Sequence, residues 1–138
     1  MSVLIKALTN VAPVIDNSPA APPTDLYNII PTANAVYDLY TAPNTSTTKR
    51  GAIVKGIRLL NTATGTTKVK ISLYFNRPTS VGQNRRRLLA PADIELPAGF
   101  AYIDEGEITL EPGDKIQAKA DTANVIQYVI SGVERDVT

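Results

Sequence analysis

The segment from residue 106 to residue 116 constrains the fold most, because it is typical of a strand, a tight turn and a second strand. Ile108 and Leu110 alternate with polar residues before the turn. Residues 111–114 (Glu-Pro-Gly-Asp) then match a type II β-turn, in which proline presets φ at the second position and glycine accepts a positive φ at the third. The segment therefore predicts β-structure with a sharp reversal.

The same period of two recurs along the rest of the chain. Residues 68–75 alternate apolar and polar side chains, as a strand with one buried face does. The turn residues at 62–67 include a glycine, so we expect strands 52–61 and 68–75 to form a hairpin. Seven or eight short antiparallel strands predict an all-β fold, an antiparallel β-sandwich of jelly-roll type. The expected strands are 36–40, 52–61, 68–75, 86–89, 93–96, 107–110, 115–120 and 125–134.

The chain changes character near residue 34. Five of its ten prolines precede Asn34, whereas all eight glycines lie at or after Gly51. Prolines at this density remove backbone donors and fix φ, which prevents a helix or an inner strand. We therefore expect an extended, proline-rich N-terminal arm over residues 1–33 and a sandwich domain over residues 34–138.

The expected arm is apolar, whereas disordered segments normally have low hydrophobicity. Its side chains are therefore expected to lie along a surface, either of the arm's own domain or of a neighbouring subunit. A first strand over residues 3–8 followed by a long loop is the alternative. The arm residues predicted to bind a partner are Val3, Leu4, Ile5, Leu8, Val14, Ile15, Leu26, Tyr27, Ile29 and Ile30.

The residue inventory argues against an enzyme. The chain has no cysteine and no histidine, which removes thiolate and Ser-His chemistry, disulfides and cysteine-based zinc sites. We expect no catalytic residues, no cofactor and no metal. A carboxylate-dependent glycan hydrolase is the remaining catalytic alternative. The acidic residues at 104–114 lack the order of an EF-hand loop, so we interpret them as strand-end charges that discourage aggregation.

The densest charge run consists of Arg85, Arg86 and Arg87. Guanidinium groups suit carboxylates and phosphates, so this basic loop is a candidate for binding a partner, with a solvated loop as the plain alternative. Aromatic residues do not interleave the run and the net charge is only +1, so a protein partner is favoured over nucleic acid. No secretory signal and no segment of about 20 apolar residues is evident, so we expect no membrane association.

Five segments together resemble a known class of proteins. They are residues 36–37 (Val-Tyr), 40–43 (Tyr-Thr-Ala-Pro), 52–62 (Ala-Ile-Val-Lys-Gly-Ile-Arg-Leu-Leu-Asn-Thr), 108–116 (Ile-Thr-Leu-Glu-Pro-Gly-Asp-Lys-Ile) and 129–134 (Val-Ile-Ser-Gly-Val-Glu). As a series they resemble small β-sandwich structural proteins of tailed bacteriophages, which include capsid decoration (cement), head-fibre and tail-associated proteins. The resemblance covers about the last hundred residues.

The resemblance implies a virion structural protein, foremost a capsid decoration protein that stabilises the head by binding neighbouring capsid subunits. Its expected partners are the major capsid protein or other virion subunits, and the expected homo-oligomer is a trimer. The expected location is the capsid surface of the virion, and the host cytoplasm during assembly. The alternative is a tail or fibre module for receptor or carbohydrate binding, with tyrosines 37, 40, 74, 102 and 128 as a sugar platform.

Overall fold

The computed structural model describes residues 3–7, 14–15, 28–78 and 85–137. Every regular element in these residues is a β-strand and every strand pairing is antiparallel, which confirms the predicted all-β, antiparallel class. No described segment forms a helix that is long and apolar enough to cross a membrane. The strands are β1 (Val3–Ala7), β2 (Val14–Ile15), β3 (Val36–Thr41), β4 (Arg50–Asn61), β5 (Val69–Asn76), β6 (Arg86–Leu88), β7 (Ile94–Leu96), β8 (Ala101–Asp104), β9 (Ile108–Leu110), β10 (Lys115–Ala120) and β11 (Ile126–Asp136).

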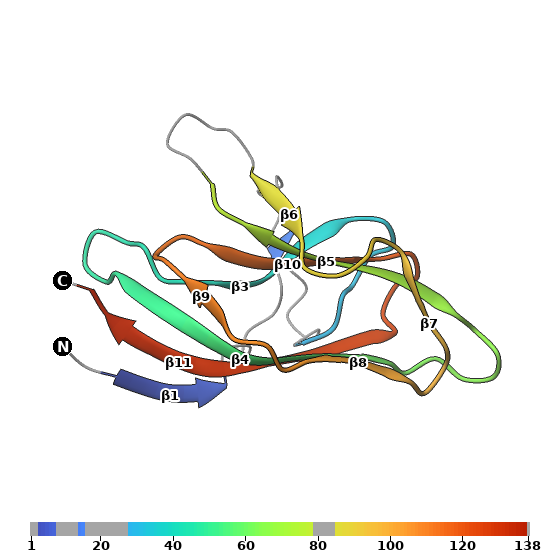
Figure 1. Cartoon of the computed structure of the whole chain (residues 1–138). Coiled ribbons are helices and arrows are strands. Elements are labelled where there is room, and N and C mark those ends of the chain that lie inside the picture. Colours follow the sequence, from blue (N-terminus) through green and yellow to red (C-terminus); the bar gives the residue numbers. More distant parts are fainter. Residues whose placement is uncertain (1–2, 8–13, 16–27, 79–84, 138) are drawn as a thin grey trace.

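The strands form two sheets that face each other (Figure 1). Sheet A has the order β1-β11-β4-β8, and β9 pairs with β4 further along the same edge. Sheet B has the order β2-β3-β10-β5-β6, and β7 likewise pairs with β5. The two strands that precede residue 34 belong to these sheets, since β1 pairs with β11 and β2 with β3.

The expected hairpin between β4 and β5 is wrong. Strand β4 lies in sheet A and β5 in sheet B, so the turn at residues 62–67 carries the chain from one sheet to the other. Both edges of β4 are already paired, with β11 on one side and β8 and β9 on the other. Strand β8 also has no counterpart among the predicted strands, because its short sequence shows little alternation.

The core lies between the two sheets and draws on both. Sheet A contributes side chains such as Ile57, Leu59 and Ile130, and sheet B contributes Ile71 and Ile116, each no more than 1% exposed. Burying a branched aliphatic side chain stabilises the fold by about 1.5–3 kcal/mol. The apolar residues that alternate with polar ones along the strands are therefore the residues that form this core.

A β-bulge interrupts the long ladder between β4 and β11. Lys55 and Gly56 lie opposite Ser131, and the pairing register shifts between Ser131 and Gly132. The extra residue changes which residues of β4 face inward, from even numbers before the bulge to odd numbers after it. Gly132 is required here because a Cβ atom would lie 2.2 Å from the carbonyl oxygen of Ile53.

The bulge predicts a contrast between two glycine substitutions. Gly132→Ala should lower the free energy of unfolding by about 1–3 kcal/mol, because the backbone of β4 must move to admit the methyl group. Gly56→Ala is the matched control, since its Cβ would lie at ordinary contact distances, 3.5 Å from the Ser131 hydroxyl and 4.0 Å from the carbonyl oxygen of Asp104. Urea unfolding of both variants measures the difference, and equal losses would contradict the close approach.

Candidate interaction surface

The structure describes most of the arm residues that the sequence singles out. Ile30 is fully buried in the domain's own core, and its backbone N–H and carbonyl bond Ile126 and Asn124. Ile29, half-buried, forms a bridge with Gln127. Leu8, Leu26 and Tyr27 lie outside the described residues. Val3, Leu4 and Ile5 lie on β1, and Val14 and Ile15 form β2.

The three consecutive arginines do not form one cluster. Arg86 and Arg87 are neighbours on β6, so their side chains point to opposite faces of sheet B. Arg86 stacks on the ring of Tyr74, with 5.3 Å between the guanidinium carbon and the ring centroid. Arg85 and Arg87 are exposed. Only these two therefore present their charges outward for a partner.

A polar network on the outer face of sheet B holds Arg86 in place. Its Nε donates to Oε1 of Gln117 at 2.9 Å, and Gln117 is fully buried. The amide nitrogen of Gln117 donates to Asp38 at 2.7 Å, and Lys115 donates to the other oxygen of Asp38 at 2.9 Å. The Gln117 amide is bonded at both ends, which offsets the cost of removing it from water. Because its guanidinium group is held by this network, Arg86 stabilises sheet B and is not presented to a partner.

The predicted type II turn at residues 111–114 is confirmed, and an ion pair between an exposed arginine and a buried carboxylate fixes it. The amide of Asp114 donates to the carbonyl of Glu111, and Gly113 has a φ of 89°. The Asp114 carboxylate is 2% exposed, and Arg77 binds it through Nε and Nη2, with the shortest contact 2.7 Å. The turn joins β9 of sheet A to β10 of sheet B, so this pair ties the two sheets at one end.

A second buried carboxylate joins the sheets directly. Glu134 on β11 is 1% exposed and accepts a hydrogen bond of 2.5 Å from the hydroxyl of Tyr40 on β3. Arg50 lies 3.5 Å from Glu134 and also donates to Asp136 at 2.8 Å. Hydrogen bonds to charged groups are the stronger kind, so the Tyr40 contact is the main polar link across the core.

The tyrosines do not form the platform that the carbohydrate hypothesis needs. Tyr37, Tyr40 and Tyr128 are buried in the core, and Tyr74 and Tyr102 are half-buried on different sheets. Burial, with the hydrogen bond to Glu134 second, raises the pKa of Tyr40 above its ordinary value of 10.0. Burial alone raises the pKa of Tyr128. The rings of Tyr37, Tyr40 and Tyr128 are part of the core.

The acidic residues at 104–114 spread over several contacts. Glu107 pairs with Lys55 at 2.5 Å, Asp104 accepts the amide of Gly106, and Asp114 binds Arg77 as described. Within the described residues, no three carboxylate, histidine or cysteine side chains come together as metal ligands would.

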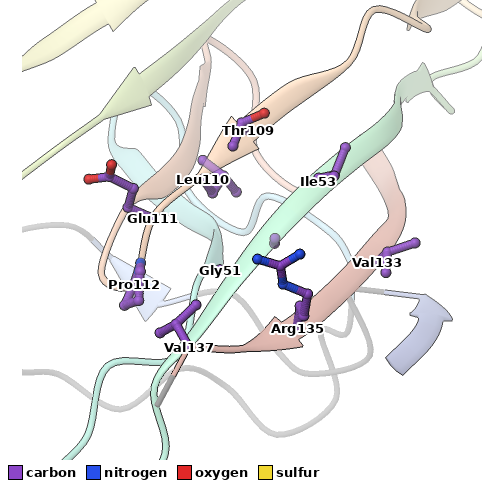
Figure 2. Close-up of a pocket in the computed structure, with 10 residues that line it drawn as sticks. Gly51, Ile53, Thr109, Leu110, Glu111, Pro112, Val133, Arg135 and Val137 are labelled. Carbon is purple, nitrogen blue, oxygen red and sulfur yellow. The ribbon is translucent and has the colours of Figure 1, made fainter. Parts of the chain in front are cut away.

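The outer face of sheet A carries a hollow that the sequence analysis did not single out (Figure 2). Its volume is about 400 Å³ and its walls are mostly apolar. Gly51 lies in the middle, where the missing side chain opens the surface. Arg135 stands on one side of β4 and Glu111 on the other. The remaining lining residues are Ala52, Ile53, Thr109, Leu110, Pro112, Val133 and Val137.

One signal in the sequence points to this face. Strand β11 carries Val129 and Val133 at odd positions, opposite to the core positions Tyr128 and Ile130. A strand with one solvated face normally shows polar residues there. The outward positions of β11 are Gln127, Val129, Ser131, Val133 and Arg135, so two of the five depart from this pattern.

Comparison with known proteins gives no relative: no protein-family model, no curated protein and no solved structure matches the chain.

Two tyrosine variants test the link across the core. Tyr40→Phe should lower the free energy of unfolding by about 1–3 kcal/mol, because Glu134 loses its closest donor while staying buried. Tyr128→Phe is the matched control, since no described residue accepts or donates a hydrogen bond at its buried hydroxyl. Chemical unfolding should show Tyr128→Phe at or above the stability of the original chain. Equal losses in both variants would contradict the assigned role of Tyr40.

The raised tyrosine pKa values predict a loss of stability in alkali. In the unfolded chain a tyrosine ionises near its ordinary pKa of 10.0. In the folded chain the pKa values of Tyr40 and Tyr128 are higher, so both stay protonated to a higher pH. Their contribution is thus complete below about pH 10 and falls as the pH rises further. Between about pH 8 and pH 11 the free energy of unfolding should fall less for the double variant Tyr40→Phe/Tyr128→Phe than for the original chain. An unchanged slope would contradict the prediction.

Proposed function

We propose that this chain is a structural protein of a tailed bacteriophage virion, foremost a capsid decoration protein that stabilises the head by binding neighbouring capsid subunits. Support comes from the five segments that resemble such proteins, which map to β3, β4, β11 and the turn between β9 and β10. Its described residues also offer the exposed pair Arg85 and Arg87 for contact with a capsid subunit.

The observation that carries the proposal is the strand order, which supports a jelly roll. A jelly roll has eight strands, B to I, in two sheets ordered BIDG and CHEF. The order β1-β11-β4-β8/β9 corresponds to BIDG if β8 and β9 together count as G. In the second sheet, β3-β10-β5-β6/β7 corresponds to CHEF in the same way, and β2 is an additional short strand beside β3. Viral capsid proteins are among the proteins that use this architecture.

The proposed mechanism is mechanical. The expected partners are the major capsid protein or other virion subunits, with the chain bound at the capsid surface. The N-terminal residues would add apolar contacts, and Arg85 and Arg87 would face carboxylates on the capsid. Binding several subunits at once resists their separation, because every new contact must break before the shell opens.

A tail or fibre module for receptor or carbohydrate binding is the second candidate. The same strand order supports it, since lectin domains also use jelly rolls. The burial of Tyr37, Tyr40 and Tyr128 weighs against a tyrosine platform as its binding surface. The glycan hydrolase is weaker still, because Asp114 and Glu107 pair with cations of the chain itself.

Capsid binding tests the proposal. The purified chain should co-sediment with tailless capsids, and Arg85→Glu/Arg87→Glu should weaken that binding by about tenfold, since like charges would face the capsid. Lys68→Glu/Lys70→Glu is the matched control, because it changes the charge equally at two exposed positions away from the basic loop. Attachment to host cells or glycans without capsid binding would favour the second candidate and remove the first.

A further inference from the structure

The outer face of sheet A concentrates the exposed apolar surface of the described residues. Six large apolar side chains are exposed among all the described residues, and four of these six lie on the outer face of sheet A. Soluble monomers rarely leave a large contiguous apolar patch uncovered. The four are Ile53 (39% exposed), Ile103 (53%), Val129 (50%) and Val137 (44%).

The strand register arranges this face in rows across the sheet. Val133, Ile53 and Thr109 form one row, from β11 across β4 to β9. The next row begins with Arg135 opposite Gly51 and reaches Glu111, just beyond the end of β9. A cation and a carboxylate thus stand on opposite sides of β4, with the apolar hollow between them (Figure 2).

We propose that this face binds the same face of a second copy of the chain. A two-fold axis that lies between the two faces, passes over Ile53 and bisects the angle between the two β4 strands turns one sheet over onto the other. It exchanges the sides of the sheet, so Arg135 of each copy lies over Glu111 of the other. The contact is isologous, with two reciprocal ion pairs around an apolar centre formed by the two Ile53 side chains.

The charges of the face explain why a second copy fits. Arg135 is exposed and has no ion-pair partner among the described residues. Glu111 lies 3.7 Å from Arg77, and both side chains are largely exposed, so that pair is weak and leaves the carboxylate available. The net charge of +1 puts little repulsion between two copies.

Repulsion between Arg58 of one copy and Arg58 of the other limits how far the contact extends along β4. Arg58 lies on β4 between Val129 and Ile103, several residues from Ile53. Stacked sheets cross at about 30°, so strands that meet at Ile53 diverge along their length. This divergence separates the two Arg58 side chains and centres the contact on the hollow.

Charge exchange tests the pairing in solution. Sedimentation equilibrium at low salt should show a concentration-dependent dimer. Arg135→Glu and Glu111→Arg should each weaken the dimer by about tenfold, because like charges would then face each other. The double variant should restore it, since the pairs reform with their signs exchanged. Lys68→Glu is the control. Lys68 is exposed and directly precedes β5 of sheet B, so this substitution should leave the dimer unchanged.

Cross-linking provides a second measurement in a chain without cysteine. Ile53→Cys lies on the proposed axis, so mild oxidation should join two copies through a disulfide, whereas Lys68→Cys should stay largely unlinked. A chain that stays monomeric at millimolar concentration would overturn the proposal. So would a double charge variant no tighter than either single one, or a trimer that the charge reversals leave intact.

Discussion

The ladder between β4 and β11 is the constraint on which the rest of the structure depends. It is the longest pairing in the described residues, and β1, β8 and β9 attach to its two strands. The bulge at Lys55 and Gly56 lets one strand serve two inward patterns, Ala52 and Val54 before it and Ile57 and Leu59 after it. The ladder tolerates this only because Gly132 leaves space for the backbone of Ile53. The pairing in the centre of sheet A therefore depends on the close approach of the Gly132 backbone to the Ile53 backbone.

Polar contacts then fix how the sheets meet. Tyr40 and Glu134 join them through the core, and Arg77 holds Asp114 at the turn that passes from one sheet to the other. Buried charges are costly to remove from water, so each is bonded by several donors. Such pairs favour one alignment of the two sheets over others, because a shifted alignment would leave a buried carboxylate unpaired. The apolar core supplies most of the stability, and these pairs select the arrangement.

The surfaces differ in how much of them the sequence could predict. The arginine run was visible, but its division into a structural Arg86 and an exposed pair depends on the alternation of β6 and on Gln117 from β10. The apolar face of sheet A was harder to see, because it combines single residues from β4, β8 and β11. Its two flanking charges, Arg135 and Glu111, become neighbours across a sheet although they lie 24 residues apart in the chain (135 − 111). Register, which depends on tertiary pairing, creates this site.

The pattern of amino acids along the chain specifies the class of the fold, the positions of most strands and the turn at residues 111–114. These depend on local physics: the period of two, the φ of proline and the freedom of Gly113. Three features depend on packing between distant segments: β4 and β5 lie in different sheets, Ile30 belongs to the core, and Gly132 lies against the backbone of Ile53. Each of these depends on a strand distant in the chain, and a local pattern cannot specify which distant strand takes a free edge.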